Sequence, residues 1–152
     1  MITGHSLGGA LATFAALDIK RKINPSNTIR FITFGSPRTG NQVFTDYVMT
    51  IFPDGAYQRV THYTDIVVQA PPRQMGFNHA GNEVWYYNSN DSNYKICENN
   101  AGSSENLLCA DSYIFTTGID AHLHYLGHPI SAMCTISGKR EIIAPQQTVF
   151  LQ

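Results

Sequence analysis

The residues Gly4-His5-Ser6-Leu7-Gly8-Gly9-Ala10-Leu11-Ala12 stand near the start of the 152-residue chain and are the most informative part of its sequence. It contains the pattern Gly-x-Ser-x-Gly, in which a serine occupies a sharp turn between a strand and a helix. Small residues are expected on both sides of Ser6, because a side chain at Gly4 or Gly8 would collide with neighbouring backbone. His5 is expected to pack and form hydrogen bonds, since a chain neighbour cannot easily aim its ring at the Ser6 hydroxyl.

The segments that follow alternate between helix-like and strand-like patterns. Residues 10–17 are apolar on nearly every side, which predicts a buried helix. Strands are predicted over 30–34, 57–62 and 83–87. Asn41 can cap a second helix, and Asp120 can cap a short helix that carries His122. This alternation predicts an α/β architecture with a mostly parallel sheet.

The amino-acid composition makes some classes of protein, such as nucleic-acid-binding and membrane-spanning proteins, less expected than others. Charged residues make up 14% of the chain, against about 25% in an ordinary soluble domain. The net charge is −1 and no basic run occurs, so a nucleic-acid partner is not expected. No apolar run approaches the roughly 20 residues of a membrane span, and the residues after Met1 do not form a signal-peptide pattern. A neutral, aromatic-rich chain fits an extracellular or interfacial protein.

The three cysteines suggest a disulfide framework. Cys97 and Cys109 flank a polar loop, and a bond between them would stabilise the fold by roughly 2–4 kcal/mol. Cys134 is then left over. Three reduced thiols in a cytosolic protein are the alternative.

A serine nucleophile on this turn needs an acid and then a histidine later in the chain. Asp65 follows the predicted strand 57–62, where loops of α/β proteins carry function. Asp46 lies on the polar face of a helix and Asp54 precedes a glycine in a turn, so both are poorer candidates.

The six histidines compete for the role of base. His5 and His62 precede Asp65, and His79 lies in a predicted loop. The remaining candidates are His122, His124 and His128. On a helix, positions 122 and 124 would point roughly 200° apart, and the pattern alone does not choose between them. The three could also be read as a metal site, but no carboxylate or thiolate accompanies them at matching spacing. Neither a metal nor another cofactor is expected.

Four segments in order resemble the fungal class 3 lipases. They are Thr3 to Ala12, then Phe34-Gly35-Ser36-Pro37-Arg38-x-Gly40-Asn41, then Arg59 to Val67 with Pro71-Pro72, and Ala121-His122-Leu123-x-Tyr125-x-Gly127. That family has the α/β-hydrolase fold and contains secreted triacylglycerol lipases, with feruloyl esterases as relatives. The resemblance covers roughly residues 1–134 and leaves 135–152 as an unassigned tail.

The resemblance implies a role for each matching position. Ser6 matches the nucleophile, Asp65 the acid, His122 the base, and Leu7 the donor of one oxyanion N–H. Cys134 matches a cysteine that pairs with an N-terminal partner. The substrate would be a carboxylic ester, such as a lipid at a lipid–water interface, and the protein would be secreted.

The chain departs from the family pattern before the serine. In the family, several strands, a lid and the loop of the second oxyanion donor precede the serine turn, and none stands before Met1. We therefore expect an incomplete α/β-hydrolase domain, weakly active or inactive alone. The alternative is a non-catalytic remnant of the fold that acts as a binding module, although a binding module has no need of Ser6, Asp65 and His122 together.

Overall fold

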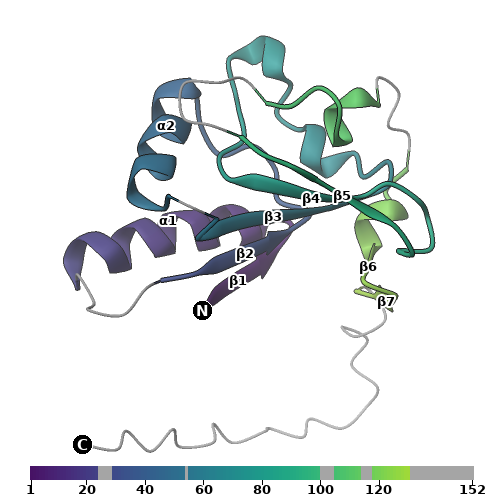
Figure 1. Cartoon of the computed structure of the whole chain (residues 1–152), viewed down its shortest axis with the longest axis horizontal. Helices are drawn as coiled ribbons and strands as arrows, with labels where there is room; N and C mark the ends of the chain where they lie inside the picture. Colours follow the sequence, from purple (N-terminus) through teal and green to yellow (C-terminus); the bar gives the residue numbers. More distant parts are fainter. Residues whose placement is uncertain (24–28, 54, 100–104, 114–117, 131–152) are drawn as a thin grey trace, which may run out of the picture.

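A five-stranded sheet in the order β1-β2-β3-β4-β5 forms the centre of the chain (Figure 1). The computed structural model describes residues 1–23, 29–53, 55–99, 105–113 and 118–130. The strands are β1 (Ile2–His5), β2 (Phe31–Phe34), β3 (Tyr57–His62), β4 (Asn82–Tyr86) and β5 (Tyr94–Cys97). The first four strands run parallel, and β5 runs antiparallel to β4. The predicted α/β architecture with a mostly parallel sheet is confirmed.

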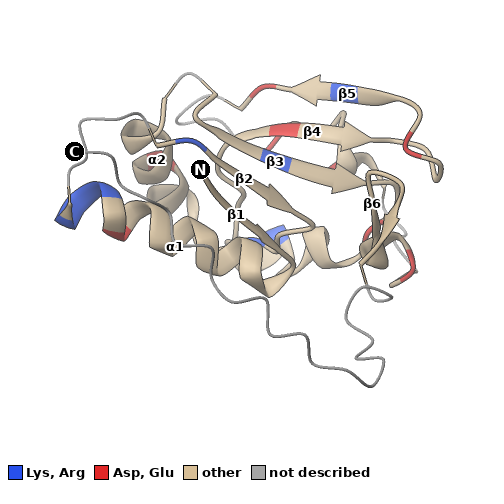
Figure 2. Ribbon diagram, turned by 90° about the horizontal axis from the view of Figure 1, so that it is seen from below, with Lys and Arg blue, Asp and Glu red and all other residues tan. Residues whose placement is uncertain are grey.

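Two α-helices connect the first three strands and lie beside each other (Figure 1). They are α1 (Leu7–Lys22) and α2 (Gln42–Ile51). The Asn41 side chain accepts a hydrogen bond from the Phe44 N–H at 3.0 Å, so the predicted cap of α2 is confirmed. Lys20, Arg21 and Lys22 lie in the last turn of α1, where cations stabilise a helix end. Figure 2 shows this basic end on a ribbon that carries few other charges.

Short elements complete the described residues. They are the 3₁₀ turns η1 (Val67–Gln69), η2 (Arg73–Met75), η3 (Ala110–Ser112) and η4 (Ala121–Leu123), and the hairpin of β6 (His124–Tyr125) with β7 (His128–Pro129). Among the described residues, no helix combines the length and apolar character that a membrane crossing requires.

The main core lies between the helices and one face of the sheet. Phe31 on β2 is fully buried and stacks on Tyr57 of β3 with ring centroids 3.9 Å apart. Ala16 and Leu17 of α1 and Val48 of α2 pack against this pair. A second cluster contains Trp85 and the disulfide between Cys97 and Cys109, which the spacing of the cysteines predicted.

The prediction that the first helix is buried on every side is wrong. Leu7, Leu11 and Phe14 are 67%, 59% and 46% exposed, whereas Ala12 and Ala16 are buried. The helix packs mainly against β1 and β2, where its small residues allow close packing, and makes a smaller contact with α2 through Phe14. A pattern that is apolar all round does not specify which side is covered.

The segment that carries His122 also differs from the prediction. It forms only the 3₁₀ turn η4 and not a longer helix, and Asp120 makes no side-chain cap bond. Because His124 already has extended backbone, helical geometry does not relate it to His122. Cys134 and the tail 135–152 lie outside the described residues.

Candidate active site

Ser6 occupies the junction between β1 and α1 in a strained conformation. Its φ is 57° and its ψ is −131°, a region that non-glycine residues rarely adopt. The Ser6 N–H donates to the Phe34 carbonyl at 2.9 Å, and its own carbonyl accepts from the Gly9 N–H at 2.9 Å. These bonds hold the turn from both sides, which fits the predicted strand–serine–helix geometry.

The glycines around this turn have different roles. A Cβ on Gly4 would lie 2.1 Å from the Gly8 carbonyl oxygen, so only glycine fits there. A Cβ on Gly8 would meet nothing within 4 Å, and the predicted collision at that position is wrong. It is the Gly8 backbone that occupies the space beside Gly4. Gly9 is the second crowded position, since its Cβ would lie 2.8 Å from the Ser36 Cβ.

The N-terminus of α1 lies directly after Ser6, so the first backbone N–H groups of the helix point toward the serine turn. Leu7 is the first residue of α1, and the leading N–H groups of a helix have no acceptor within it. They also lie at the positive end of the helix dipole. The Leu7 N–H therefore has the chemistry of an oxyanion donor, which remains a prediction for this residue.

Asp65 and His122 form a buried pair across 57 residues of sequence. The His122 Nδ1 lies 2.8 Å from the Asp65 Oδ2, and the two residues are 5% and 1% exposed. Because a carboxylate accepts, Nδ1–H is the donor, and this leaves Nε2 with a lone pair for a proton. An imidazole oriented in this way is suited to act as a general base.

Tyr125 is a further residue that contacts Asp65, and it was not among the residues predicted from the sequence. Its hydroxyl donates to the same Asp65 Oδ2 at 2.5 Å, while Oδ1 accepts from the Val67 N–H at 2.7 Å. Burial, with the nearby Asp65 charge, raises the pKa of Tyr125 well above its usual value, so it remains a donor. Three donors compensate for burying the carboxylate. The only sequence signal was the place of Tyr125 in the segment 121–127.

Because Gly35 has no side chain, it provides room for the Asp65 and His122 side chains. It follows β2 with a φ of +55°. A Cβ there would lie 2.9 Å from the Tyr125 hydroxyl, 3.0 Å from the Asp65 Oδ2 and 3.0 Å from the His122 Cε1. The turn after β2 is therefore part of the site.

His5 joins the serine turn to the His122 segment. Its Nε2 lies 2.9 Å from the His122 carbonyl oxygen, and the two rings have centroids 4.5 Å apart. Partial burial lowers the pKa of His5, although the hydrogen bond to this carbonyl opposes the shift. His5 has the packing and hydrogen-bonding role that was predicted for it. The contact brings the residue preceding Ser6 against the base candidate.

Comparison with known proteins gives a consistent relationship. Residues 1–75 match the family described as lipase (class 3). The chain is 36% identical over 130 residues to a lipase of Rhizomucor miehei, covering 83% of this chain and 34% of that protein. It is 37% identical over 133 residues to secreted mono- and diacylglycerol lipase 1 of Fusarium solani, covering 82% and 36%.

Solved structures that are similar to this chain are also lipases. Lipase II from Rhizopus niveus superimposes with a TM-score of 0.73 at 37% identity, over 84% of this chain and 46% of that chain. The chain belongs to the class 3 lipase family. A triacylglycerol lipase described as having a serine protease triad at its catalytic centre matches with a TM-score of 0.70 at 35% identity, over 83% and 46%.

This class 3 lipase chain spans about a third of the length of the two curated relatives (34% and 36%). Its fold is that of the α/β hydrolases. The residues that match the family, 1–75, include Ser6 and Asp65, whereas His122 lies beyond them. The pairing of His122 with Asp65 therefore comes from the structure of this chain.

The other histidines of this class 3 lipase chain do not join the pair. His124 is exposed and its Nδ1 donates to the Asp120 carbonyl at 3.0 Å, and His128 is exposed on β7. Over the residues that the structure describes, no three His, Cys, Asp or Glu side chains gather as a metal site would require. The alternative of a metal bound by His122, His124 and His128 thus gains no support from their placement.

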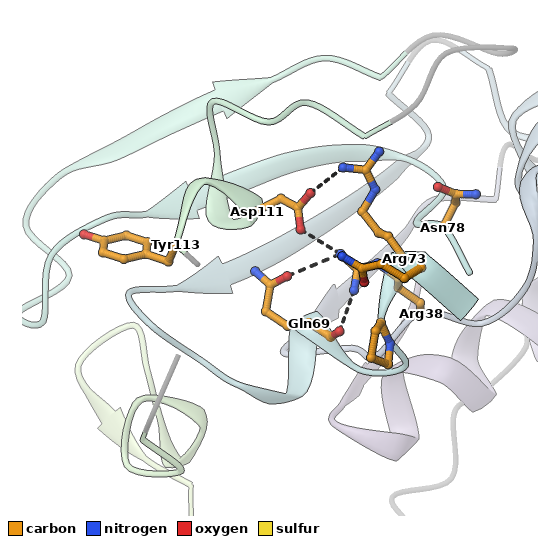
Figure 3. Close-up of a pocket in the computed structure, with 8 residues that line it drawn as sticks. Arg38, Gln69, Arg73, Asn78, Asp111 and Tyr113 are labelled. Carbon is orange, nitrogen blue, oxygen red and sulfur yellow. Dashed lines mark hydrogen bonds and ion pairs between the residues drawn. The ribbon is translucent and has the colours of Figure 1, made fainter. Parts of the chain in front are cut away.

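A polar cavity of about 600 Å³ is lined by residues that include neither Asp65 nor His122. Figure 3 shows this cavity. The labelled residues around it are Arg38, Gln69, Arg73, Asn78, Asp111 and Tyr113. Arg38 and Arg73 both donate to Asp111, at 2.9 and 2.7 Å, and Arg38 also binds Glu105. Since these carboxylates compensate the arginines, the network joins loops together and does not resemble an ester-binding site.

Proposed function

We propose that this chain carries the catalytic residues of a serine esterase of the class 3 lipase type, with acylglycerols as the substrate class. The observation that carries the proposal is the buried contact between His122 Nδ1 and Asp65 Oδ2 at 2.8 Å. It stands at the ends of the parallel strands, next to the turn that holds Ser6. The named activities of the relatives, lipase and mono- and diacylglycerol lipase, support this substrate class.

In the proposed reaction, Ser6 is the nucleophile, His122 transfers the proton and Asp65 orients His122. His122 Nε2 removes the Ser6 proton as Oγ attacks the ester carbonyl carbon. Asp65 holds the imidazole in the required tautomer and stabilises the imidazolium that forms. The carbonyl oxygen becomes an oxyanion, which the Leu7 N–H at the start of α1 stabilises. His122 then gives the proton to the departing alcohol, and water hydrolyses the acyl-serine by the same steps.

Turnover by the 152 residues alone is expected to be weak. Among the residues assigned here, Leu7 is the single oxyanion donor, and the loss of one such donor costs roughly 10²–10³ in kcat. A covalent probe is therefore a more sensitive test than ester turnover, because a single reaction with the nucleophile is detectable.

Secretion and a lipid partner complete the proposal. The Fusarium solani relative is named a secreted lipase, and the bond between Cys97 and Cys109 fits an oxidising compartment. The low share of charged residues, 14%, suits contact with a lipid–water interface.

Labelling with a fluorophosphonate tests the proposal, because this reagent captures an activated serine. We expect the wild-type chain to bind one label at Ser6, as located by peptide mass, and Ser6→Ala to bind none. The exposed Ser89 provides a matched control, and Ser89→Ala is expected to label like wild type. Equal labelling of wild type and Ser6→Ala would remove Ser6 from the chemistry. An unlabelled chain that still binds triacylglycerol emulsions would instead support the binding module.

A further inference from the structure

His62 and Asp91 are two buried ionisable residues that the proposed mechanism does not use. Their side chains are 3% and 10% exposed, and the His62 Nε2 lies 3.5 Å from the Asp91 Oδ1. His62 Nδ1 lies 2.8 Å from the Ala121 carbonyl oxygen, and the Asp91 Oδ2 accepts from the Gly127 N–H at 2.8 Å. The pair therefore contacts the backbone on both sides of the segment that carries His122.

The sheet topology explains how these two residues meet. His62 is the last residue of β3 and is paired with Tyr86, the last residue of β4. Asp91 lies in the turn from β4 to β5, so this turn projects beyond the same end of the sheet. Asp91 has a φ of 54°, a left-handed conformation that aspartate and asparagine adopt more readily than most residues.

The partner of each His62 ring nitrogen indicates whether that nitrogen donates or accepts a hydrogen bond. A carbonyl oxygen only accepts, so His62 Nδ1–H is the donor to Ala121. His62 Nε2 and Asp91 Oδ1 then face each other, and among the described residues neither atom has a hydrogen-bond partner. This contact is attractive whenever Nε2 carries a proton. The His62 ring also packs edge-on against Tyr125, with ring centroids 5.6 Å apart.

We propose that His62 and Asp91 form a clamp that positions His122 for catalysis. Ala121 immediately precedes His122, and Gly127 follows Tyr125 by two residues. Fixing both points sets the direction of the two side chains that contact Asp65. The effect on reaction rate rests on the proposed esterase function, whereas the effect on His122 geometry does not.

Substitutions at Asp91 can distinguish the effect of its side-chain contacts from the effect of its backbone conformation. Asp91→Gly removes the carboxylate, and glycine adopts a positive φ without steric cost. Asp91→Asn keeps both contacts in another form: its Oδ1 can accept from Gly127, and its Nδ2 can donate to the Nε2 lone pair of a neutral His62, in place of the wild-type contact between a protonated Nε2 and Oδ1. At the other residue, His62→Ala removes both contacts. His62→Asn keeps a donor near the position of Nδ1 and loses only the contact with Asp91.

Two measurements on the full chain test the proposal. The first is the downfield proton NMR signal of His122 Nδ1–H, assigned by its loss in His122→Gln. The second is the rate of fluorophosphonate labelling at Ser6. In Asp91→Gly and His62→Ala we expect a shifted or lost signal and labelling slower by about 10- to 100-fold, since small misplacements of catalytic groups cost that much. Asp91→Asn is expected to keep the signal and a rate within about threefold of wild type.

Each outcome decides the proposal. An Asp91→Gly chain with wild-type signal and rate would overturn it, as would equal losses in Asp91→Gly and Asp91→Asn, which indicate a general structural role. If His62→Ala does not fold, His62→Asn is compared with wild type, and an unchanged signal there contradicts the clamp. A wild-type chain that never labels, together with loss of the signal in Asp91→Gly, supports the clamp and rejects the esterase.

Discussion

At the scale of single residues, the Asp65 carboxylate is the centre of the site. Its two oxygens accept bonds from Val67, His122 and Tyr125, which come from two separate segments of the chain. A buried carboxylate needs this many donors, because an unpaired buried charge costs several kcal/mol. The same donors orient Asp65, so one set of contacts serves both stability and the proposed chemistry.

Gly35→Ala is predicted to disrupt the pair without removing any of its members. The new Cβ would lie 2.9 Å from the Tyr125 hydroxyl and 3.0 Å from the Asp65 Oδ2. We expect labelling at Ser6 to fall by about 100-fold, because the pair must move away. Gly76→Ala is the matched control: Gly76 also has a positive φ, +85°, but its Cβ would meet nothing within 4 Å. That variant is expected to lose about 1–2 kcal/mol of stability and to label normally. Similar labelling of the two variants would contradict the prediction.

At the scale of elements, the β1–α1 junction determines where the nucleophile stands. β1 and α1 meet so closely that the Gly8 backbone fills the place of a side chain at Gly4, while Ser36 from the turn after β2 crowds Gly9. Ser6 adopts its strained φ between them, and hydrogen bonds from neighbouring segments hold it. This is the usual arrangement in which strain at a functional residue is maintained by the surrounding structure.

Gly4→Ala and Gly8→Ala are predicted to behave oppositely, although both glycines belong to the same pattern. An alanine at 4 would place Cβ 2.1 Å from the Gly8 oxygen, so the start of α1 must separate from β1. We expect that variant to be destabilised by more than about 4 kcal/mol or not to fold. Gly8→Ala has open space and is expected to gain about 0.4–1 kcal/mol, since alanine loses less entropy on folding. Urea unfolding followed by circular dichroism measures both, and equal stabilities would show that the crowding at Gly4 is unimportant.

At the scale of the whole molecule, a buried polar network fastens the loops after β3 to those after β5. Arg38 binds Glu105 through two nitrogens and also contacts the Gln69 and Pro71 carbonyls. Burial, the largest single influence, opposes ionisation of Glu105, but the hydrogen bonds from Arg38 and the nearby charges of His79, Arg59 and Arg38 together outweigh it and lower the pKa to about 2. His79 donates its backbone N–H to Glu105, and burial lowers the pKa of its ring to about 3.

Acid is therefore predicted to destabilise the chain from near neutrality downward. Below pH 6.5, His79 binds a proton in the unfolded chain and not in the folded chain, so stability falls by up to about 1.4 kcal/mol per pH unit toward pH 3. Glu105 adds a second loss between about pH 4.5 and pH 2. His79→Gln, which can still donate to the Val68 carbonyl, is expected to have a smaller slope between pH 6.5 and 5, and the remaining slope is assigned to His5, whose pKa burial also lowers. Urea midpoints across this range measure the slope. The exposed His128 is the control, and His128→Gln should retain the wild-type slope; the same slope in His79→Gln would contradict the prediction.

Several local features of this protein follow from its residue pattern. It predicted the strand–serine–helix turn, the cap at Asn41, the strand at 57–62 and the pairing of Cys97 with Cys109, and the structure has all four. Each of them has a recognisable pattern of residues close together along the chain, so the sequence is sufficient to predict them. Their formation still uses distant partners, since β3 pairs with β2 and β4 and the Ser6 N–H donates to the Phe34 carbonyl.

Contacts between groups far apart in the sequence are seen only in the folded chain. The fold placed His122 against Asp65, a choice that the residue pattern left open between His122 and His124 and that the family resemblance implied. It also added Tyr125 and Gly35 to the site, showed crowding at Gly9 in place of Gly8, and left one side of α1 exposed. The physical reason is that parallel strands gather their carboxyl ends at one edge, so residues far apart in sequence become neighbours there. Those contacts depend on packing across the whole sheet, which no local pattern encodes.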